Sequence, residues 1–458
     1  MSLLTRTAPR PAVHEPRRTT DGLRSEPAAR PEPSDRPHRA DRRRRADTGP
    51  LPEPPAHREL VRRDLAAEAQ RIRLGDLVRE HGSPLFVLDT ARIAAQLAEL
   101  RRELPGVGIH FATKSLPHPA VIRAVQASGA SFEVASRGEV DLLEREGVAI
   151  AGCLHTHPVK TAADLTGAYL RGIRTFVVDS PSEIGKFAGL PSGEVGVLVR
   201  LSFPNPGAKS DLSSKFGVAP EHAAALVERC LAARLPVRGF TFHVGSQTTS
   251  AEPWRRAIAT TLQLMRVLEA RHGIRFDLLD LGGGFPVAYD EPVPPLGDLA
   301  RGIRSALAAV PRHVRVVVEP GRFVAAPAMT LVTRVVGTSE RADGRWHYLD
   351  EGLYGAYSNI PAEDVHALVF AASELGVRPS GEDSAERAAR RVLARTRVPV
   401  TLAGPTCDSV DVIARRLPLP PLADGDLLVS PMMGAYTWAT ATGFNGIAPT
   451  PVLVLPAS

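Results

Sequence analysis

Strand-like and helix-like patterns of apolar residues alternate along most of the chain. Residues 83–89 read as a strand and 91–104 have apolar positions at helical spacing. Eight short apolar runs follow at 109–114, 131–136, 152–156, 175–179, 195–202, 237–244, 276–281 and 314–319. Helical stretches separate them, most clearly at 119–127, 138–146, 162–170, 221–234, 253–271 and 299–310. This pattern predicts a parallel (β/α)8 TIM barrel over residues 90–330. A doubly wound open sheet is the alternative, disfavoured because eight units follow one another without a visible topological switch.

The helical alternation stops at about residue 330, where short β-rich runs begin. We expect an antiparallel β domain, a β-sandwich or β-barrel, built from residues 331–458 together with 74–89. The charged stretch 373–396 reads as a helical or mobile insertion, and the sequence does not decide between them.

The N-terminal part of the chain has a different composition. Eleven prolines precede residue 56, and residues 1–60 carry 13 arginines and nine acidic residues but few large apolar side chains. We therefore expect residues 1–65 to be a disordered Arg/Pro-rich extension. Its four consecutive arginines at 42–45 could touch polyanions, but an ordinary solvated tail is the simpler interpretation.

Charge and cysteine content exclude several classes of protein. The net charge of +6 comes mostly from the extension, so the remaining chain is nearly neutral and is not expected to bind nucleic acid. No apolar run is long enough to cross a membrane and no secretory signal is visible, which predicts a cytoplasmic protein. The three cysteines are widely separated, so we expect neither a disulfide framework nor a metal site.

Lys114 ends the first of the eight strands, and its residue type is rare here. Of the 56 basic residues five are lysines, so the chain uses arginine wherever charge alone suffices. A desolvated lysine can lose its proton and attack a carbonyl carbon, which an arginine cannot do. Lys114 is therefore a candidate for a Schiff base, although a lysine that extends from a strand end toward solvent would look the same in isolation.

Other polar residues follow the later strands, at the end where a barrel carries its chemistry. The three glycines 282–284, together with Arg322, predict a cradle for a phosphate monoester. A lysine beside such a cradle suggests pyridoxal 5′-phosphate, and Glu319 could pair with the ring nitrogen of that cofactor. His243 could stack on the ring, or it could be a hydrogen-bonded core histidine.

Short motifs in consistent order give the chain a family resemblance. They are FATK at 111–114, FEVAS at 132–136, FHVGS at 242–246, LGGGFP at 281–286, EPGR at 319–322, PTCD at 405–408, GAYT at 434–437 and FNG at 444–446. From about residue 84 to 447 the chain resembles the ornithine/diaminopimelate/arginine decarboxylase family. The resemblance implies an alanine-racemase-like fold, a barrel with a C-terminal β domain.

The resemblance also implies roles for individual residues. Lys114 would form the internal aldimine with pyridoxal phosphate, with His243 stacked on its ring and Glu319 at its nitrogen. Cys407 would return a proton after carbon dioxide leaves, and Asp408 would hold the distal amine of the substrate. The phosphate would be held by Ser246, Gly282, Gly283, Gly284, Arg322 and Tyr436, while Arg200 would support the phenolic oxygen side.

Two positions depart from the family pattern. Glu133 stands where the family usually has aspartate, and Ala362-Glu363 stands where the ornithine branch has a Tyr-Asp pair. Glu363 keeps a carboxylate for binding the substrate, but with a different reach.

The sequence thus predicts a decarboxylase for a basic amino acid, with L-ornithine first and L-lysine second, serving polyamine biosynthesis. Asp408 favours a simple distal ammonium over the second carboxylate of diaminopimelate. The rivals are diaminopimelate decarboxylase, an alanine-racemase-like racemase, which Glu319 disfavours, and a non-catalytic regulatory homologue. Because Cys407 and Asp408 lie in the β domain, the active site is expected to be shared across a homodimer.

Overall fold

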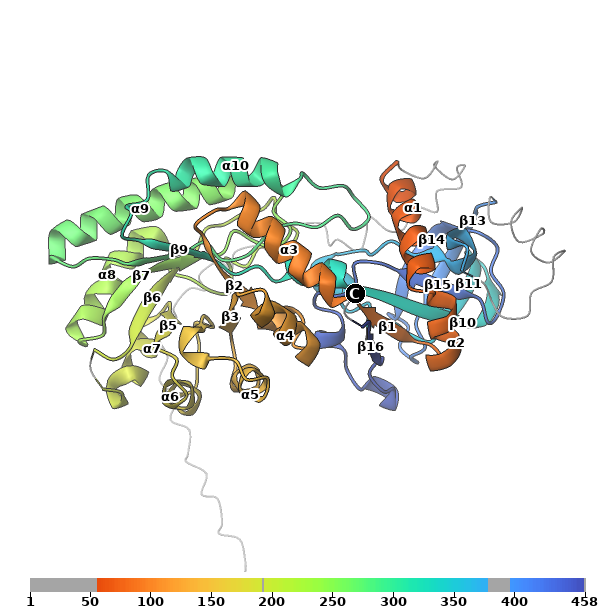
Figure 1. Ribbon diagram of the computed structural model, residues 1–458, viewed down its shortest axis with the longest axis horizontal. Coiled ribbons are helices and arrows are strands. Elements are labelled where there is room, and N and C mark those ends of the chain that lie inside the picture. The colour runs from red at the N-terminus through yellow and green to blue at the C-terminus, as the bar shows by residue number, and fades with distance from the viewer. Residues whose placement is uncertain (1–55, 192, 378–395, 457–458) are drawn as a thin grey trace, which may run out of the picture. The chain divides into compact units, whose positions relative to one another are not determined.

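Eight parallel strands close into a barrel in the computed structural model, which describes residues 56–191, 193–377 and 396–456 (Figure 1). The closing pair joins Ile109 of the first strand to Val318 of the last. The strands are β2 (Gly108–Ala112), β3 (Ser131–Val134), β4 (Leu154–His155), β5 (Thr175–Val178), β6 (Gly196–Leu201), β7 (Val237–Phe242), β8 (Leu278–Asp280) and β9 (Arg315–Val318). Each overlaps one of the eight apolar runs, and β2 alone begins one residue before its run, so the predicted (β/α)8 barrel is confirmed.

A helix follows every barrel strand. The helices are α4 (Pro119–Ala127), α5 (Arg137–Arg145), α6 (Ala162–Leu170), α7 (Pro181–Gly185), α8 (Pro220–Ala232), α9 (Glu252–His272), α10 (Leu296–Leu307) and α11 (Arg322–Ala325). In α4, Pro119 occupies the first turn and Val121, Ile122 and Val125 form the buried face, which is the usual pattern of an amphipathic helix. Before the barrel, α3 (Thr90–Glu103) packs on α4, α10 and α11.

The remaining strands form an eight-stranded sheet beside the barrel. They are β1 (Leu85–Leu88), β10 (Met329–Arg341), β11 (Gly344–Leu349), β12 (Phe370–Ala371), β13 (Val398–Ala403), β14 (Val412–Leu419), β15 (Leu427–Ser430) and β16 (Val452–Val454). The predicted β domain is present, but it is mixed and not purely antiparallel, because β1 pairs with β16 and β11 with β13 in parallel.

Two helices near the N-terminus correct the predicted boundary of the extension. Helix α1 (Ala56–Arg71) contains ten residues that the sequence assigned to a disordered segment 1–65. Leu65 and Ala69 of α1 are buried in one cluster with Phe370 and Val429 of the sheet, and α2 (Leu74–His81) adds Leu74 to it. The prediction failed because arginine and alanine dominate α1 and hide its narrow apolar face. Residues 1–55 lie outside the described residues.

The predicted insertion at 373–396 is described only at its start. Residues 372–375 form the 3-10 helix η6 (Ala372–Leu375), and 378–395 lie outside the described residues. The short helix α12 (Asn359–Glu363) precedes β12. Within the described ranges, no helix is both long and apolar enough to cross a membrane.

Candidate active site

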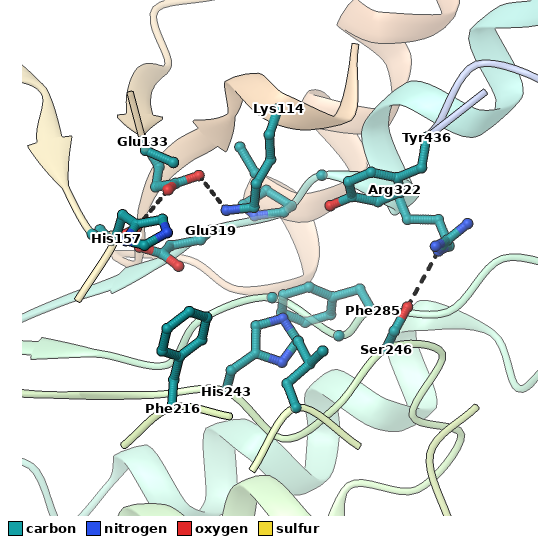
Figure 2. A pocket seen from close by; sticks show the side chains of 18 of the residues that line it. Lys114, Glu133, His157, Phe216, His243, Ser246, Phe285, Glu319, Arg322 and Tyr436 are labelled. Carbon is teal, nitrogen blue, oxygen red and sulfur yellow. Dashed lines mark hydrogen bonds and ion pairs between the residues drawn. The ribbon is translucent and has the colours of Figure 1, made fainter. Parts of the chain in front are cut away.

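A cavity of about 340 Å³ opens at the C-terminal ends of the barrel strands (Figure 2). It gathers most of the residues that the sequence predicted for the site. Its lining includes Lys114, Glu133, Thr156, His157, Arg200, Lys215, Phe216, His243, Ser246, Gly283, Gly284, Glu319, Arg322, Glu363 and Tyr436.

Lys114 stands in a 3-10 turn, η2 (Thr113–Ser115), immediately after β2. Its Nζ donates to Glu133 Oε2 at 2.7 Å, and the other oxygen of Glu133 accepts from Thr156 Oγ1 at 2.5 Å. These three side chains end or follow the neighbouring strands β2, β3 and β4, where Ala112 pairs with Glu133. The lysine side chain keeps 45% of its surface exposed because it stands in the open cavity.

The surroundings of Lys114 favour its charged form. Burial would lower the pKa of Lys114, but the nearby Glu133, Tyr436 and Glu319 raise it above its ordinary value. Burial works to raise the pKa of Glu133, and the charge and hydrogen bond of Lys114 outweigh this and lower it. Lys114 and Glu133 therefore form an ion pair, an ammonium beside a carboxylate.

His243 faces Lys114 from the opposite side of the cavity (Figure 2). Its Nδ1 accepts from the backbone N–H of Gly245 at 3.0 Å, which fixes the ring and leaves the proton on Nε2. Burial first, and then Arg200 and Lys114, lower the pKa of His243 to about 3. The ring is thus a neutral flat surface at pH 7. Arg200 lines the same wall, with its guanidinium carbon 5.5 Å from the centre of the Phe216 ring.

Glu319 is a buried carboxyl with one unsatisfied oxygen. Among the described residues, no partner hydrogen-bonds to Glu319 Oε1. Burial, followed by the neighbouring carboxyls of Asp280 and Glu133, raises the pKa of Glu319 well above its ordinary value. An acceptor of this kind is stabilised by any cationic donor that enters the cavity.

The glycines after β8 are required by close backbone packing. A Cβ on Gly283 would lie 2.8 Å from the carbonyl oxygen of Glu319, and one on Gly284 would lie 2.5 Å from that of Gly245. Gly283 and Gly284 line the cavity, as predicted. Gly282 does not belong to the cavity lining among the described residues, and its N–H donates to Asp280 Oδ1 at 3.0 Å. The expectation that the Gly282 amide binds phosphate is therefore not supported by this geometry.

Arg322 is buried at the start of α11 and is held on several sides. Its Nη1 donates to the hydroxyl of Tyr289 at 2.9 Å, its Nη2 to Glu363, and its Nε to Ser246 Oγ at 3.4 Å. The guanidinium also lies 4.9 Å from the centre of the Tyr436 ring. Arginine and hydroxyl donors meet here as a phosphate site requires, with Glu363 beside them.

Cys407 and Asp408 lie away from this cavity. Asp408 accepts from the hydroxyl of Tyr354, and the N–H of Cys407 donates to Asn445 Oδ1 at 3.0 Å. Cys407 is exposed, and neither residue is among the described residues that line the cavity of their own chain. Of the residues predicted for the site, these two and Gly282 are the ones that the cavity does not include.

Comparison with known proteins decides the family. Residues 90–326 match the model of the pyridoxal binding domain of pyridoxal-dependent decarboxylases. The lysine/ornithine decarboxylase of Selenomonas ruminantium is 32% identical over 82% of this chain and 91% of its own. The chain belongs to the pyridoxal-dependent decarboxylases. Two structures of the lysine/ornithine decarboxylase of Vibrio vulnificus agree, each with a TM-score of 0.76. The complex with putrescine is 39% identical over 84% of this chain and 98% of its own, and the complex with cadaverine is 40% identical over 85% and 99%.

The cavity of this pyridoxal-dependent decarboxylase fits the cofactor that the family uses. Glu319 Oε1 lacks a donor that a protonated ring nitrogen would supply. Gly283 and Gly284 have no room for a side chain, and they line the cavity together with Arg322 and Ser246, where a phosphate would be held. His243 would present its neutral ring to the pyridine, and Lys114 is the lysine that would carry the cofactor.

The decarboxylase cavity contains residues that sequence reasoning missed. Thr156 and His157 directly follow β4 and line the cavity, and the position of both at a strand end is the signal that could have indicated them. Glu133, which the sequence marked only as a departure from the family pattern, contacts both Lys114 and Thr156. Tyr289 lies seven residues beyond Gly282, and no local pattern indicates its contact with Arg322.

Four of the five lysines lie in connections that directly follow barrel strands, and Lys186 begins the 3-10 helix η4 (Lys186–Gly189) after α7. Lys114 and Lys215 line the cavity, and the N–H of Lys209 donates to the carbonyl of Ser246 at 3.0 Å. Lys160 is buried after β4, and the Nζ of Lys186 donates to the carbonyl of Lys160 at 2.5 Å.

Proposed function

We propose that this decarboxylase releases carbon dioxide from L-ornithine, giving putrescine, and second from L-lysine, giving cadaverine. The reaction would belong to polyamine biosynthesis in the cytoplasm. One observation carries the proposal: Lys114 and the unsatisfied carboxyl of Glu319 reach the same cavity, with the neutral ring of His243 facing the lysine. The relatives support the choice of substrate, since they are called lysine/ornithine decarboxylase and their structures hold putrescine or cadaverine.

Pyridoxal phosphate supplies an electron sink for the pair of electrons left on Cα when carbon dioxide departs. The residues of the chain prepare the cavity for this step. Glu133 holds the Lys114 ammonium. Glu319 would pair with the ring nitrogen, and Arg322, Ser246 and Tyr436 would hold the phosphate, assisted by the N–H groups of Gly283 and Gly284. Arg200 would support the phenolic oxygen side.

Carboxylates select the basic end of the substrate in this proposal. Asp408 and Glu363 would bind the distal ammonium, which explains a preference for diamine precursors over neutral amino acids. Glu363 supports this role because it lies in the cavity wall, between Ser246 and Arg322.

The proton donor would come from a second copy of the chain. Cys407 would protonate Cα after carbon dioxide leaves, and Asp408 would enter the same cavity from the partner of a homodimer. The location of both residues outside the cavity of their own chain supports a shared site.

A product assay with purified protein and pyridoxal phosphate tests the proposal. Ornithine, lysine, arginine and diaminopimelate are supplied separately, and carbon dioxide and amine are measured, with Lys114→Ala as the inactive control. We expect the highest kcat/KM for ornithine and the second highest for lysine. A higher kcat/KM for diaminopimelate would overturn the assignment of ornithine as the substrate. Interconversion of enantiomers without release of carbon dioxide would indicate a racemase. Cofactor binding without turnover of any substrate would favour a regulatory protein.

A further inference from the structure

Tyr289 supports Arg322 from the side that faces away from the cavity. Its buried hydroxyl accepts from Arg322 Nη1 at 2.9 Å, whereas the other contacts of this guanidinium, Ser246 and Glu363, line the cavity. Tyr289 is not part of that lining among the described residues. It therefore meets Arg322 without taking space from a ligand.

The segment that carries Tyr289 is fixed to the barrel next to Ser246, one of the residues that would hold the phosphate. The side-chain amide of Gln247 accepts from the N–H of Val287 and donates to its carbonyl, both at 2.8 Å. Gln247 directly follows Ser246, and Phe285 stacks on Trp254 with ring centres 5.3 Å apart. Segment 285–289 thus has little freedom on its barrel side.

Helix α1 secures the other side of this segment. Nε2 of His57 lies 2.9 Å from the carbonyl oxygen of Tyr289, and because a carbonyl can only accept, His57 donates. The next residue, Arg58, is buried, donates to the carbonyl of Val369 at 2.7 Å and lies 4.3 Å from the centre of the Phe370 ring. The first turn of α1 is therefore anchored on the sheet and bonded to the barrel loop at once.

We propose that Tyr289 is a positioning residue for Arg322, and that the first turn of α1 holds Tyr289 in place through His57. Helix α1 then belongs to the cofactor-binding apparatus, although none of its residues lines the cavity within the described chain. The inference rests on the proposed role of Arg322 as a phosphate ligand. It follows from an uninterrupted path of two hydrogen bonds, from His57 to the Tyr289 carbonyl and from Arg322 to the Tyr289 hydroxyl.

Binding of two probes to the cofactor-free full-length protein tests the proposal. Pyridoxal 5′-phosphate carries the group that Arg322 would hold, and pyridoxal lacks it. We expect Tyr289→Phe to weaken binding of pyridoxal phosphate about tenfold, because Arg322 loses a charged hydrogen bond that orients it. Pyridoxal binding should change less than about twofold, and kcat at saturating pyridoxal phosphate should be retained.

Matched variants distinguish a specific effect on the position of Arg322 from a general loosening of the folded structure. Tyr357→Phe removes another buried tyrosine hydroxyl, bonded to Ser430 Oγ at 2.9 Å, and should leave both affinities unchanged. Arg322→Met should weaken the binding of pyridoxal phosphate but not the binding of pyridoxal. Adding Tyr289→Phe to Arg322→Met should not weaken the binding of pyridoxal phosphate further. If Arg322→Met has no effect, the phosphate role itself fails. If Arg322→Met weakens binding and Tyr289→Phe does not, the positioning role alone fails.

His57, which is half-buried, keeps the test decisive if Tyr289→Phe does not fold. His57→Leu should weaken the binding of pyridoxal phosphate several-fold. His57→Gln should bind it as the natural chain does, since the glutamine amide can donate to the same carbonyl. Arg63→Ala, at an exposed position of α1, is the control. Equal affinities for His57→Leu and the natural chain would overturn the role of α1.

Discussion

Glu133 changes the setting of the reactive lysine by one methylene relative to the aspartate that the family resemblance implies. The longer side chain reaches both Lys114 and Thr156. Because the pKa of Lys114 is raised and the pKa of Glu133 is lowered, the two side chains are held as an ammonium and a carboxylate. A position that the sequence marked only as a departure is therefore part of the lysine's immediate environment.

Lys114 should be the residue that carries the cofactor. Borohydride reduction of the loaded protein should fix pyridoxal phosphate to one peptide, which contains Lys114, because no arginine can form such a bond. Peptide mapping by mass spectrometry measures this. Label on Lys160 or Lys215 would disprove the assignment, and Lys114→Ala should remain unlabelled.

The sequence predicted residues of the site where they directly follow a barrel strand or belong to one of the short motifs. Lys114, His243, Glu319 and Arg322 are of this kind. The contact between Arg322 and Glu363 was not predictable, because it joins the barrel to α12 across 41 positions and depends on how the two domains pack. The contact of Tyr289 with Arg322 joins the connection after β8 to the first residue of α11, 33 positions away, and no local pattern indicates it.

At the scale of elements, one buried ion pair shapes the connection after β4. Lys160 Nζ donates to the carbonyls of His157, Pro158 and Val177 at 3.0, 2.9 and 2.7 Å, and lies 3.6 Å from Glu183. This connection presents His157 to the cavity. Burial, only partly opposed by Glu183, lowers the pKa of Lys160 from its ordinary value to about 8.

Replacing Lys160 should therefore cost stability in a pH-dependent way. We expect Lys160→Met to lower the free energy of unfolding by about 3 kcal/mol near pH 7, because three buried carbonyls lose their donor and Glu183 loses one of its two lysine partners. In the natural chain, the unfolded state holds the Lys160 proton more tightly between pH 8 and 10.5, so this group makes stability rise with pH there.

Denaturant unfolding at pH 8, 9 and 10 measures both effects. Lys160→Met should lack the contribution of about 1 kcal/mol per pH unit that this lysine makes. Lys209→Met, at an exposed position, should keep it. Identical pH dependence in the two variants would contradict the expectation.

The elements that sequence reasoning missed have physical explanations. Strand β14 carries Arg415 and Arg416 at exposed positions and a proline near its end, so its apolar alternation is broken. Strand β12 has two residues, too few for a periodicity. In α1, Arg58 is buried against Phe370. Composition alone would place an arginine at the surface, so it does not reveal this buried position.

At the scale of the whole molecule, the β domain displays its own chemical residues on an outer surface. Cys407 is exposed, and Val410 and Phe444 near it are exposed apolar side chains. Phe444 stacks on Tyr354, whose hydroxyl binds Asp408. This surface supports the proposed two-fold assembly, in which each copy completes the cavity of the other.

Mixing two inactive variants should restore activity if the sites are shared. Lys114→Ala and Cys407→Ala proteins, after subunit exchange, should give about a quarter of the natural activity, since half of the dimers are mixed and each has one intact site of two. The measurement is amine formation before and after exchange. If subunit exchange is demonstrated and activity does not return, Lys114 and Cys407 of one site come from the same chain.

The placement of the five lysines also makes the chain convenient for chemical footprinting. Lys114 and Lys215 line the cavity and Lys209 is exposed next to Ser246, whereas Lys160 is buried, so an amine-selective reagent modifies lysines around the mouth of the cavity. A lysine-specific endoprotease likewise meets exposed cleavage points there. Protection from either reagent would then report which molecule fills the mouth, without any spectroscopic label.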